Sequence, residues 1–413
     1  MYFLYNIAIT IAWYILKIPA LFNKKIALFI SGRKKVFLFL EAQISKNDSV
    51  IWMHTASLGE FEQGLPLLQK LKKTHPKYKF LVTFFSPSGY EVKKNSKEAD
   101  FITYLPLDTV TNVDRFLSIV TPKLAIFVKY EIWPNFFQKL QQRNIPILLI
   151  SGIFNKKQVY FKGYGGFMRS ALRRVSHFFV QNEVSADLLR SIRIDTISVT
   201  GDTRFDRVSE ILERDNELSF MRLFKGEHLC VVAGSTWPED EELLLASIQN
   251  APDSVKFVIA PHDIKEAHIQ KLQASFNKKT ILYSEMNQQD FADYQVLIID
   301  TIGLLTKIYS YADIAYVGGG FATGLHNTLE PAVFGIPVVI GPQYHGFKEA
   351  EELVTLGGIK VVTKKEDLLQ LVDALLTDSK FRTEIGRINS TYIERNTGAT
   401  HKILEHIEHH SLL

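Results

Sequence analysis

The sequence predicts an α/β protein made of two halves, each with a parallel sheet covered by helices. Short apolar runs alternate with helical patterns at intervals of roughly 20–30 residues, which is the spacing of β-α-β units. This alternation occurs twice, over residues 50–200 and again over residues 229–363. The polar stretch 207–226 separates the two halves, and 413 residues are enough for two or three domains.

Composition and charge are those of a globular protein. The chain is 46% hydrophobic and 22% charged, and its formal net charge is +4. Residues 1–40 carry six basic side chains and no acidic one, so the remainder is slightly acidic. That distribution argues against nucleic acid as a partner, whereas a basic start beside apolar residues suits an anionic membrane surface. The single cysteine, Cys230, excludes an intramolecular disulfide and fits a reducing cytoplasm.

The first 22 residues are strongly apolar and are interrupted only by Asn6, Thr10 and Lys17. Their length is close to the ~20 residues that cross a bilayer. They lack the basic start and the small-residue cleavage site of a secretory signal. Because basic residues follow the apolar run, the rest of the chain is expected on the cytoplasmic side. We expect residues 1–22 to associate with a membrane, either by crossing it or by lying in the interface.

Fourteen apolar runs are candidate strands. Those of the first half are 50–53, 79–85, 101–105, 124–128, 147–150, 177–180 and 197–199. Those of the second half are 229–233, 257–260, 280–283, 296–299, 314–317, 338–340 and 360–362. Helical patterns occupy the intervals, and residues 366–411 look helical to the end.

The first candidate strand leads directly to a carboxylate, Glu60, at the mouth of a helical pattern. In open α/β sheets, ligands bind at the carboxyl ends of strands. A capping box between Ser57 and Glu60 is one alternative, and an acid favoured by the helix dipole is another. Pro66 argues against the capping box, because an internal proline costs ~3 kcal/mol. We therefore expect the helix to begin about one turn later, which leaves Glu60 just outside it.

Several other strand ends carry polar residues. Glu131 follows the run 124–128, and His262 follows the run 257–260. After the run 229–233, Thr236 and Glu239 have the spacing of a capping box. Free N–H groups at that helix start would hold an anion equally well.

The stretch 317–342 carries the densest signal. Gly318, Gly319 and Gly320 follow a strand and allow the backbone to approach a ligand closely. The stretch matches neither the dinucleotide fingerprint nor the Walker loop. Asn327 and Glu330 then open a helix, where free N–H groups suit a phosphate and an acid suits ribose hydroxyls. An ordinary N-cap is the alternative, and we favour a nucleotide site.

These motifs together resemble the 3-deoxy-D-manno-octulosonic acid (Kdo) transferases of Gram-negative bacteria, glycosyltransferase family 30. The similar stretches are WMHTASLGE (52–60), YEIWPN (130–135), GDTRFD (201–206), AGSTWPEDE (233–241), Pro261-His262 and GLHNTLEPAVFGIPVVIGP (324–342). The resemblance covers nearly the whole chain. It implies a GT-B fold, in which two Rossmann-like domains face a cleft. It also implies transfer of Kdo from CMP-Kdo to lipid IVA at the cytoplasmic face of the inner membrane, in lipopolysaccharide biosynthesis.

The resemblance divides the chain into five parts. We expect a membrane-associated segment at 1–22, an acceptor-side Rossmann-like domain at 23–206, a linker at 207–226, a CMP-Kdo-binding Rossmann-like domain at 227–390 and a C-terminal helix at 391–413.

The resemblance also assigns residue roles. Glu60 matches the family's proton acceptor, and Glu131 and Arg204 match positions that stabilise the transition state. Substrate and CMP contacts are expected from Ser57, Gly59, Pro261, His262, Ile302, Gly303, Leu304, Asn327, Thr328, Leu329 and Glu330.

The chain departs from the family at two of these positions. Leu304 stands where the family usually has Glu, so only backbone contacts are expected there. Arg204 stands where a lysine is usual; both are cations, but they are not interchangeable at a fixed geometry.

Glycosyl transfer with inversion needs a base near the acceptor hydroxyl and stabilisation of the leaving phosphate. Glu60 supplies the base, and Arg204, His262 and the N–H groups near Asn327 suit the phosphate. No Asp-x-Asp sequence occurs in the chain, and CMP carries one phosphate. We therefore predict that the protein requires no metal and no other cofactor.

Other functions remain open at this point. A sugar-nucleotide epimerase shares the fold but has no need of an apolar, basic N-terminus. Another membrane-associated glycosyltransferase would share that N-terminus as well. A periplasmic binding protein would need a cleavable signal, which the sequence lacks.

Overall fold

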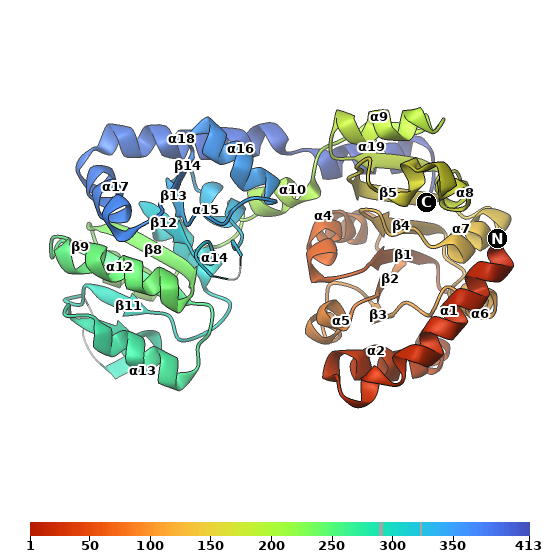
Figure 1. Ribbon diagram of the computed structural model, residues 1–413, viewed down its shortest axis with the longest axis horizontal. Helices are drawn as coiled ribbons and strands as arrows, with labels where there is room; N and C mark the ends of the chain where they lie inside the picture. Colours follow the sequence, from red (N-terminus) through yellow and green to blue (C-terminus); the bar gives the residue numbers. More distant parts are fainter. Residues whose placement is uncertain (289–291, 323) are drawn as a thin grey trace. The chain divides into compact units, whose positions relative to one another are not determined.

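The computed structural model describes residues 1–288, 292–322 and 324–413. The chain forms two units, each with a seven-stranded parallel sheet and helices on both faces (Figure 1). The first unit comprises Met1–Arg207 and Thr397–Leu413, and the second comprises Val208–Asn396. The α/β class and the two parallel sheets expected from the sequence are confirmed.

The first sheet has the strand order β3-β2-β1-β4-β5-β6-β7. Its strands are β1 (Val50–Thr55), β2 (Lys79–Phe84), β3 (Phe101–Tyr104), β4 (Leu124–Val128), β5 (Ile147–Gly152), β6 (His177–Val180) and β7 (Ile197–Val199). The chain runs outward from β1 to β3 and then returns to pair β4 with β1. The carboxyl ends of β1 and β4 therefore mark the switch point of this sheet, where open α/β folds bind ligands.

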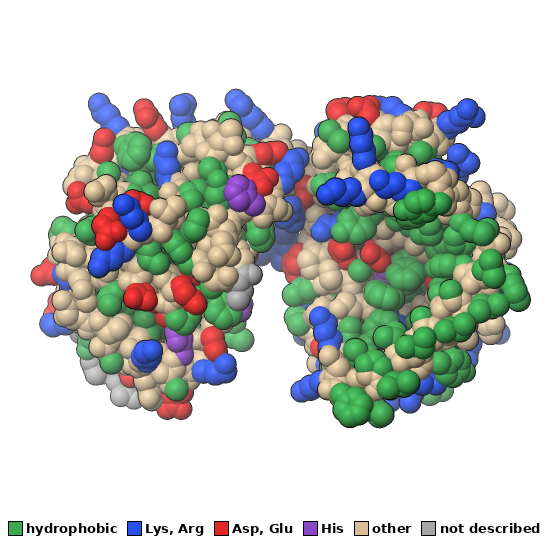
Figure 2. Space-filling model, viewed as in Figure 1, with side chains coloured by type: hydrophobic (Ala, Val, Ile, Leu, Met, Phe, Trp, Pro, Cys, Tyr) green, Lys and Arg blue, Asp and Glu red, His purple; other side chains and the backbone are tan. Residues whose placement is uncertain are grey.

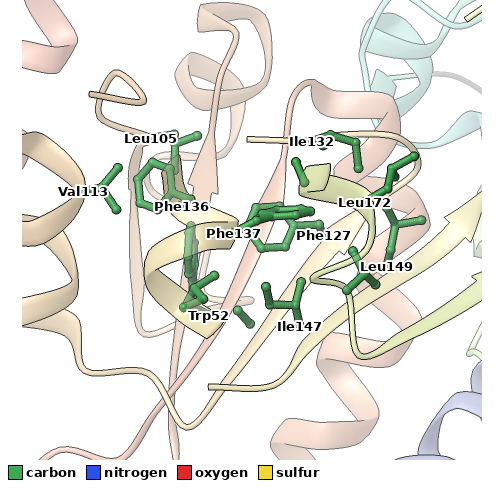
Figure 3. Packing of buried hydrophobic residues seen from close by; sticks show 14 of the residues in the cluster. Trp52, Leu105, Val113, Phe127, Ile132, Phe136, Phe137, Ile147, Leu149 and Leu172 are labelled. Atoms are coloured by element: carbon green, nitrogen blue, oxygen red, sulfur yellow. The ribbon is translucent and has the colours of Figure 1, made fainter. Parts of the chain in front are cut away.

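Most strands of the first sheet are buried on both faces, as parallel strands usually are, and the edge strand β7 is only half-buried. All six residues of β1 are buried, and alternate side chains enter different hydrophobic clusters. Trp52 packs against Phe127 and Phe136 on one face, with ring centroids 5.1 and 5.3 Å away (Figure 3). Met53 packs into the cluster on the other face. Because β1 is packed between two hydrophobic clusters, the start of the loop that follows it is held in place.

In the first unit, each strand is followed by a helix before the next strand begins. They are α1 (Tyr2–Leu16), α2 (Lys24–Lys34), α3 (Val36–Gln43), α4 (Leu58–Thr74), α5 (Pro87–Lys93), α6 (Val110–Val120), α7 (Pro134–Gln142), α8 (Gly166–Leu172), α9 (Glu183–Ser191) and α19 (Ala399–His409). A further helix, α10 (Thr203–Ser209), extends across the boundary at Arg207.

Helix α1 contacts the first unit through polar side chains. The Tyr5 hydroxyl donates to the Oδ2 atom of Asp108 at 2.8 Å. The Oδ1 atom of Asn6 accepts the N–H of Val110 at 3.0 Å and the amide of Asn135 at 3.2 Å. These contacts hold the N-terminal half of α1 against the starts of α6 and α7.

The other side of α1 is apolar and exposed. Figure 2 shows hydrophobic side chains gathered along this helix. Phe3 is 75% exposed and Ile11 is 53% exposed. The stretch Tyr2–Leu21 has 20 residues and a mean hydropathy of 1.4, which is long and apolar enough to cross a membrane. None of it is buried, so this apolar surface lacks a partner within the residues that the structure describes.

The second sheet has the strand order β10-β11-β9-β8-β12-β13-β14, and its switch point lies between β8 and β12. Its strands are β8 (Leu229–Thr236), β9 (Val255–Pro261), β10 (Thr280–Leu282), β11 (Val296–Ile298), β12 (Ile314–Val317), β13 (Val338–Ile340) and β14 (Ile359–Val361). Its helices are α11 (Ser219–Lys225), α12 (Pro238–Asn250), α13 (Glu266–Ser275), α14 (Leu305–Ile308), α15 (Leu329–Ala332), α16 (Lys348–Leu356), α17 (Lys365–Thr377) and α18 (Ser379–Asn396).

Candidate active site

Glu60 lies in the first turn of α4, immediately after β1. Ser57 is the N-cap of that helix, and its backbone N–H donates to the Oε2 atom of Glu60 at 2.8 Å. The Ser57 hydroxyl donates to the same oxygen at 3.2 Å. The Oε1 atom of Glu60 accepts no hydrogen bond from the residues described. One carboxylate oxygen therefore orders the helix start, and the other is left for a ligand.

The expectation that α4 begins one turn later was wrong. The helix begins at Leu58, Glu60 is its third residue, and Pro66 lies in its interior. The free-energy cost of the internal proline is offset by packing, because Pro66 is buried together with Leu65 and Leu67. Tertiary burial overrides a local preference here, as it commonly does.

Glu131 lies on the loop between β4 and α7, at the same edge of the sheet. Its negative charge acts on Glu60: burial raises the pKa of the Glu60 carboxyl, the charge of Glu131 raises it further, and Lys129 opposes both. Glu60 is only 7% exposed. The two carboxylates at the switch point thus form an acidic site in which Glu60 holds a proton more tightly than a free glutamate does.

His54, in β1, is a buried residue that contacts Glu131 of this site. Its ring is fully buried, and its Nε2 atom lies 3.6 Å from the Oε2 atom of Glu131. Its Nδ1 atom is within hydrogen-bonding distance of the Thr83 hydroxyl, at 2.9 Å. The ring also packs edge-on against Trp133. We read His54 as a residue that orients Glu131, which the sequence did not reveal because His54 lies in β1 and Glu131 lies on the loop after β4.

Arg204 is held by its neighbour Asp202. Its backbone N–H donates to one carboxylate oxygen of Asp202 and its Nε atom donates to the other, both at 2.9 Å. Asp202 is buried and also accepts the side-chain amide of Gln63, on α4, at 3.0 Å. Thr203 joins this network by donating to the backbone oxygen of Gln63. Arg204 and Glu60 are thereby linked through α4, and Arg204 is oriented by a buried acid.

The candidate donor site in the second unit contains a stack of three aromatic rings. The ring of His262 stacks on those of Trp237 and His326, with centroids 4.6 and 4.7 Å away. The indole N–H of Trp237 donates to the Nε2 atom of His326 at 3.1 Å. Burial, reinforced by His262, lowers the pKa of His326. The exposed His262 ring thus packs on two rings that are hydrogen-bonded to each other.

Asp240 is the capping residue of α12, which corrects another expectation. The N-cap is Trp237, and its backbone N–H donates to the Oδ2 atom of Asp240 at 2.9 Å. The expected pair of Thr236 and Glu239 is wrong by one residue, because β8 extends to Thr236 and its hydroxyl donates to Glu241 instead. Pro238 then occupies the first helical position, where its missing N–H costs nothing.

The three glycines after β12 are required by the chain itself. A Cβ on Gly318 would lie 2.4 Å from the backbone oxygen of Ser235, and one on Gly320 would lie 2.7 Å from the backbone of Gly341. The N–H of Gly319 donates to Asp240 at 2.9 Å, and its φ is +93°. The close approach is therefore to neighbouring backbone, and these contacts account for the glycines without a ligand.

Glu330 lies in the first turn of α15 and is half-buried. Its Oε2 atom accepts the Thr306 hydroxyl at 2.7 Å, and its Oε1 atom accepts the Asn327 amide at 3.0 Å. Asn327 also caps the helix through the N–H of Leu329. Both carboxylate oxygens thus have partners in the absence of nucleotide, and the site is ordered in advance.

The remaining predicted residues differ in how accessible they are. Ile302 is 86% exposed, and Gly303 has a φ of +95° with open space around it. Leu304 is the N-cap of α14. Gly59 is exposed, whereas Pro261 and Thr328 are buried at the ends of their elements. The structure therefore gathers Ser57, Gly59, Glu60, Glu131 and Arg204 in the first unit, and the other predicted residues in the second.

The two seven-stranded parallel sheets, with polar residues at their carboxyl edges, give the chain a GT-B-like fold. A family model described as 3-deoxy-D-manno-octulosonic-acid transferase (kdotransferase) matches residues 32–207. The 3-deoxy-D-manno-octulosonic acid transferase of Haemophilus influenzae is 28% identical over 86% of each chain. That of Aquifex aeolicus is 28% identical over 86% of this chain and 95% of its own. The chain is thus similar to 3-deoxy-D-manno-octulosonic acid transferases over most of its length.

A comparison of solved structures concerns the fold alone. The chain is similar to UDP-GlcNAc 2-epimerase from Neisseria meningitidis, with a TM-score of 0.60 over 86% of this chain and 98% of that chain. The identity between them is 16%, so the likeness extends to the two-domain architecture and not to the reaction.

Proposed function

We propose that the chain is an inverting glycosyltransferase that moves Kdo from CMP-Kdo to lipid IVA during lipopolysaccharide biosynthesis. Similarity to the 3-deoxy-D-manno-octulosonic acid transferases supports the reaction and the donor. The observation that carries the proposal is the buried Glu60 carboxylate beside Glu131 at the switch point of the first sheet. Its raised pKa suits a general base, because a base works best when its pKa approaches the operating pH.

In the proposed reaction, Glu60 takes the proton from the acceptor hydroxyl. The hydroxyl oxygen forms a bond to the anomeric carbon of Kdo while the bond from that carbon to the phosphate oxygen breaks. CMP leaves with the electron pair, and the negative charge on its phosphate grows. Arg204, His262 and the N–H groups near Asn327 are the groups proposed to stabilise that charge. Glu131 keeps the pKa of Glu60 high.

We propose that the protein acts at the cytoplasmic face of the inner membrane, with α1 lying on the membrane surface. Tyr5 and Asn6 bind polar groups of the first unit. A helix that crossed the bilayer would either break these bonds or carry polar partners into hydrocarbon, which is costly. The exposed apolar side of α1 and the basic residues after it suit an interfacial helix instead.

Incubation of the full-length protein with CMP-Kdo, with and without lipid IVA, tests the reaction. Release of CMP that depends on lipid IVA, with a product heavier by one or more Kdo residues, supports the transferase. Release or conversion of the nucleotide sugar without acceptor would support an epimerase or hydrolase and contradict the proposal. Repeating the assay with Glu60→Gln tests the base, and Glu62→Gln is its matched control. Glu62 lies two residues from Glu60 and forms ion pairs with Lys93 and Arg207 instead.

A further inference from the structure

An apolar pocket opens at the surface of the first unit, between the end of α1, the start of α2 and the loop after β2. Its volume is about 350 Å³, within the range of ligand-binding pockets. It is lined by Leu16, Lys25, Ile26, Phe29, Phe85, Ser86 and Pro87. Most of these side chains are apolar, and the exposed Lys25 adds a cation at the rim.

The aromatic walls of the pocket are fixed in place by a buried arginine. Arg33 is 6% exposed, and its guanidinium lies 3.7 Å from the centroid of the Phe29 ring and 4.8 Å from that of Phe85. It donates to the backbone oxygens of the same two residues, at 3.0 and 2.8 Å. The two rings meet edge to face, with centroids 5.2 Å apart. The pocket is therefore formed in advance.

The pocket adjoins the loops of the candidate active site. The N–H of Ser86 donates to the backbone oxygen of Ala56 at 2.7 Å, and Ala56 immediately precedes the N-cap of α4. The other face of Phe85 packs on Trp133, with centroids 4.9 Å apart, and Trp133 lies two residues after Glu131. The loop that forms one wall of the pocket is thus bonded to the loop of Glu60 and packed on the loop of Glu131.

The pocket also adjoins the exposed apolar surface of α1. Leu16 lines the pocket, and its neighbours Ile15 and Ile18 are 59% and 66% exposed. The apolar surface of α1 thus continues to the pocket at Leu16.

We propose that this pocket binds a fatty acyl chain of the lipid acceptor, with Lys25 facing an anionic group of the same lipid. The proposal rests on the proposed function, because it takes the acceptor to be a lipid. The apolar lining and the rigid aromatic walls suit a hydrocarbon chain, and the position beside both carboxylate loops favours the acceptor over bulk phospholipid. Holding one chain here places the acceptor's sugar at the edge of the sheet that carries Glu60.

The first test is kinetic. A larger side chain is placed in the pocket, and the KM is compared for lipid IVA with and without its acyl chains. Ile26→Trp and Leu16→Trp should each raise the KM for lipid IVA by on the order of 10-fold, since each buried methylene contributes roughly four-fold in affinity. The KM for CMP-Kdo, and the KM and kcat for lipid IVA stripped of its acyl chains, should not change. Val184→Trp, at a 66% exposed site on α9, is the control. An unchanged KM for lipid IVA, or an equal rise for both acceptors, would overturn the proposal.

A binding test separates this proposal from the reaction itself. Lipid IVA that carries a diazirine on an acyl chain is photolysed with the full-length protein, and the labelled residues are mapped by mass spectrometry. Labelling of Ile26, Phe29 or Phe85, lost on filling the pocket, supports the proposal even if no Kdo is transferred. Labelling of the outer surface of α1 alone, or displacement of the probe by excess phosphatidylethanolamine, would show that the pocket is not an acceptor site.

Discussion

The Nε2 atom of His54 lies 3.6 Å from the Oε2 atom of Glu131, and the imidazole is fully buried. The charge of Glu131 in turn raises the pKa of Glu60. His54, near the end of β1, thus contacts Glu131 on the loop after the neighbouring strand β4, and the charge of Glu131 acts on Glu60, which follows β1. The predictions below separate this electrostatic arrangement from the helix-capping role of Glu60.

Glu60→Gln should separate the two roles of this residue. Glutamine still accepts the N–H of Ser57, so the melting temperature should stay within about 2 °C of the wild type. It is not a base, so turnover should fall by ~10²–10⁴-fold. Turnover with saturating CMP-Kdo and lipid IVA, measured beside Glu62→Gln, checks this. Near-normal turnover would eliminate Glu60 as the base.

Glu131→Gln should shift the pH profile. Because the charge of Glu131 raises the pKa of Glu60, its removal lowers that pKa. The acidic limb of the kcat profile, along which activity rises as Glu60 loses its proton, should move to lower pH. Glu62→Gln should leave the limb where it is. A limb that stays in place in Glu131→Gln would mean that another group sets it.

Arg204→Met should reduce turnover by roughly 10²–10³-fold, the usual effect of removing one donor to a developing negative charge. Arg204→Lys keeps the cation but loses the Nε contact to Asp202, so we expect a reduction of about ten-fold or less. Single-turnover rates at saturating donor measure both. Equal losses in the two variants would assign the effect to the contact with Asp202, and not to the charge facing the phosphate.

Glu330→Gln tests the donor site in the second unit. If Glu330 binds the ribose of CMP, the loss of a charged acceptor should weaken CMP binding by ~1–3 kcal/mol. Glutamine keeps the shape and can still accept the Thr306 hydroxyl, so folding of the unit should be unaffected. Calorimetric titration with CMP checks this, with Glu366→Gln, at an exposed site on α17, as the control. Unchanged CMP affinity would remove Glu330 from the site.

Asp108, which is buried and accepts the Tyr5 hydroxyl, should make the free energy of unfolding depend on pH. Burial raises the pKa of Asp108 from 3.8 to about 6, so the folded unit binds this proton more tightly than the unfolded chain does. The resulting stabilisation is fully present below about pH 4 and is lost as pH rises through about 6, by roughly 3 kcal/mol in total. The Tyr5 hydroxyl favours the charged carboxylate and so limits that loss.

Tyr5→Phe should therefore lower the free energy of unfolding by ~1.5–3 kcal/mol at pH 8 and by less at pH 5. Urea unfolding in detergent at the two pH values measures the difference. Tyr14→Phe is the matched control, because Tyr14 is on the same helix and is 61% exposed. An equal loss at both pH values would show that the hydroxyl does not act through Asp108.

Most strands were predictable because they are short apolar runs with buried side chains. The runs at 124–128, 177–180 and 314–317 match β4, β6 and β12 residue for residue. Other boundaries differ from the expected ones: β1 continues through His54 and Thr55, whose side chains are buried, whereas β2 and β3 each end one residue earlier. Sequence patterns cannot show that a polar side chain finds its partner on another strand.

The candidate site was predictable only in part, for the same reason. The position of Glu60 at a strand end followed from local patterns, but the contact of His54 with Glu131 depends on how the strands are ordered in the sheet. The start of α4 was misplaced because the cost of Pro66 is local, while the packing that offsets it comes from the rest of the unit. The bond from Tyr5 to Asp108 joins residues 103 positions apart and leaves no local signal.

The last helix, α19, belongs to the first unit, where Ile403 and Ile407 enter the core and Asp206 binds the N–H groups of Gly398 and Thr400. The whole of the second unit is therefore synthesised before α19, the helix that completes the first unit. Helix α1 precedes both sheets along the chain, so its apolar side is exposed until α19 has been synthesised and can complete the first unit. Early contact of α1 with a membrane would shield it during this interval, so membrane targeting and folding of the first unit are coupled in time.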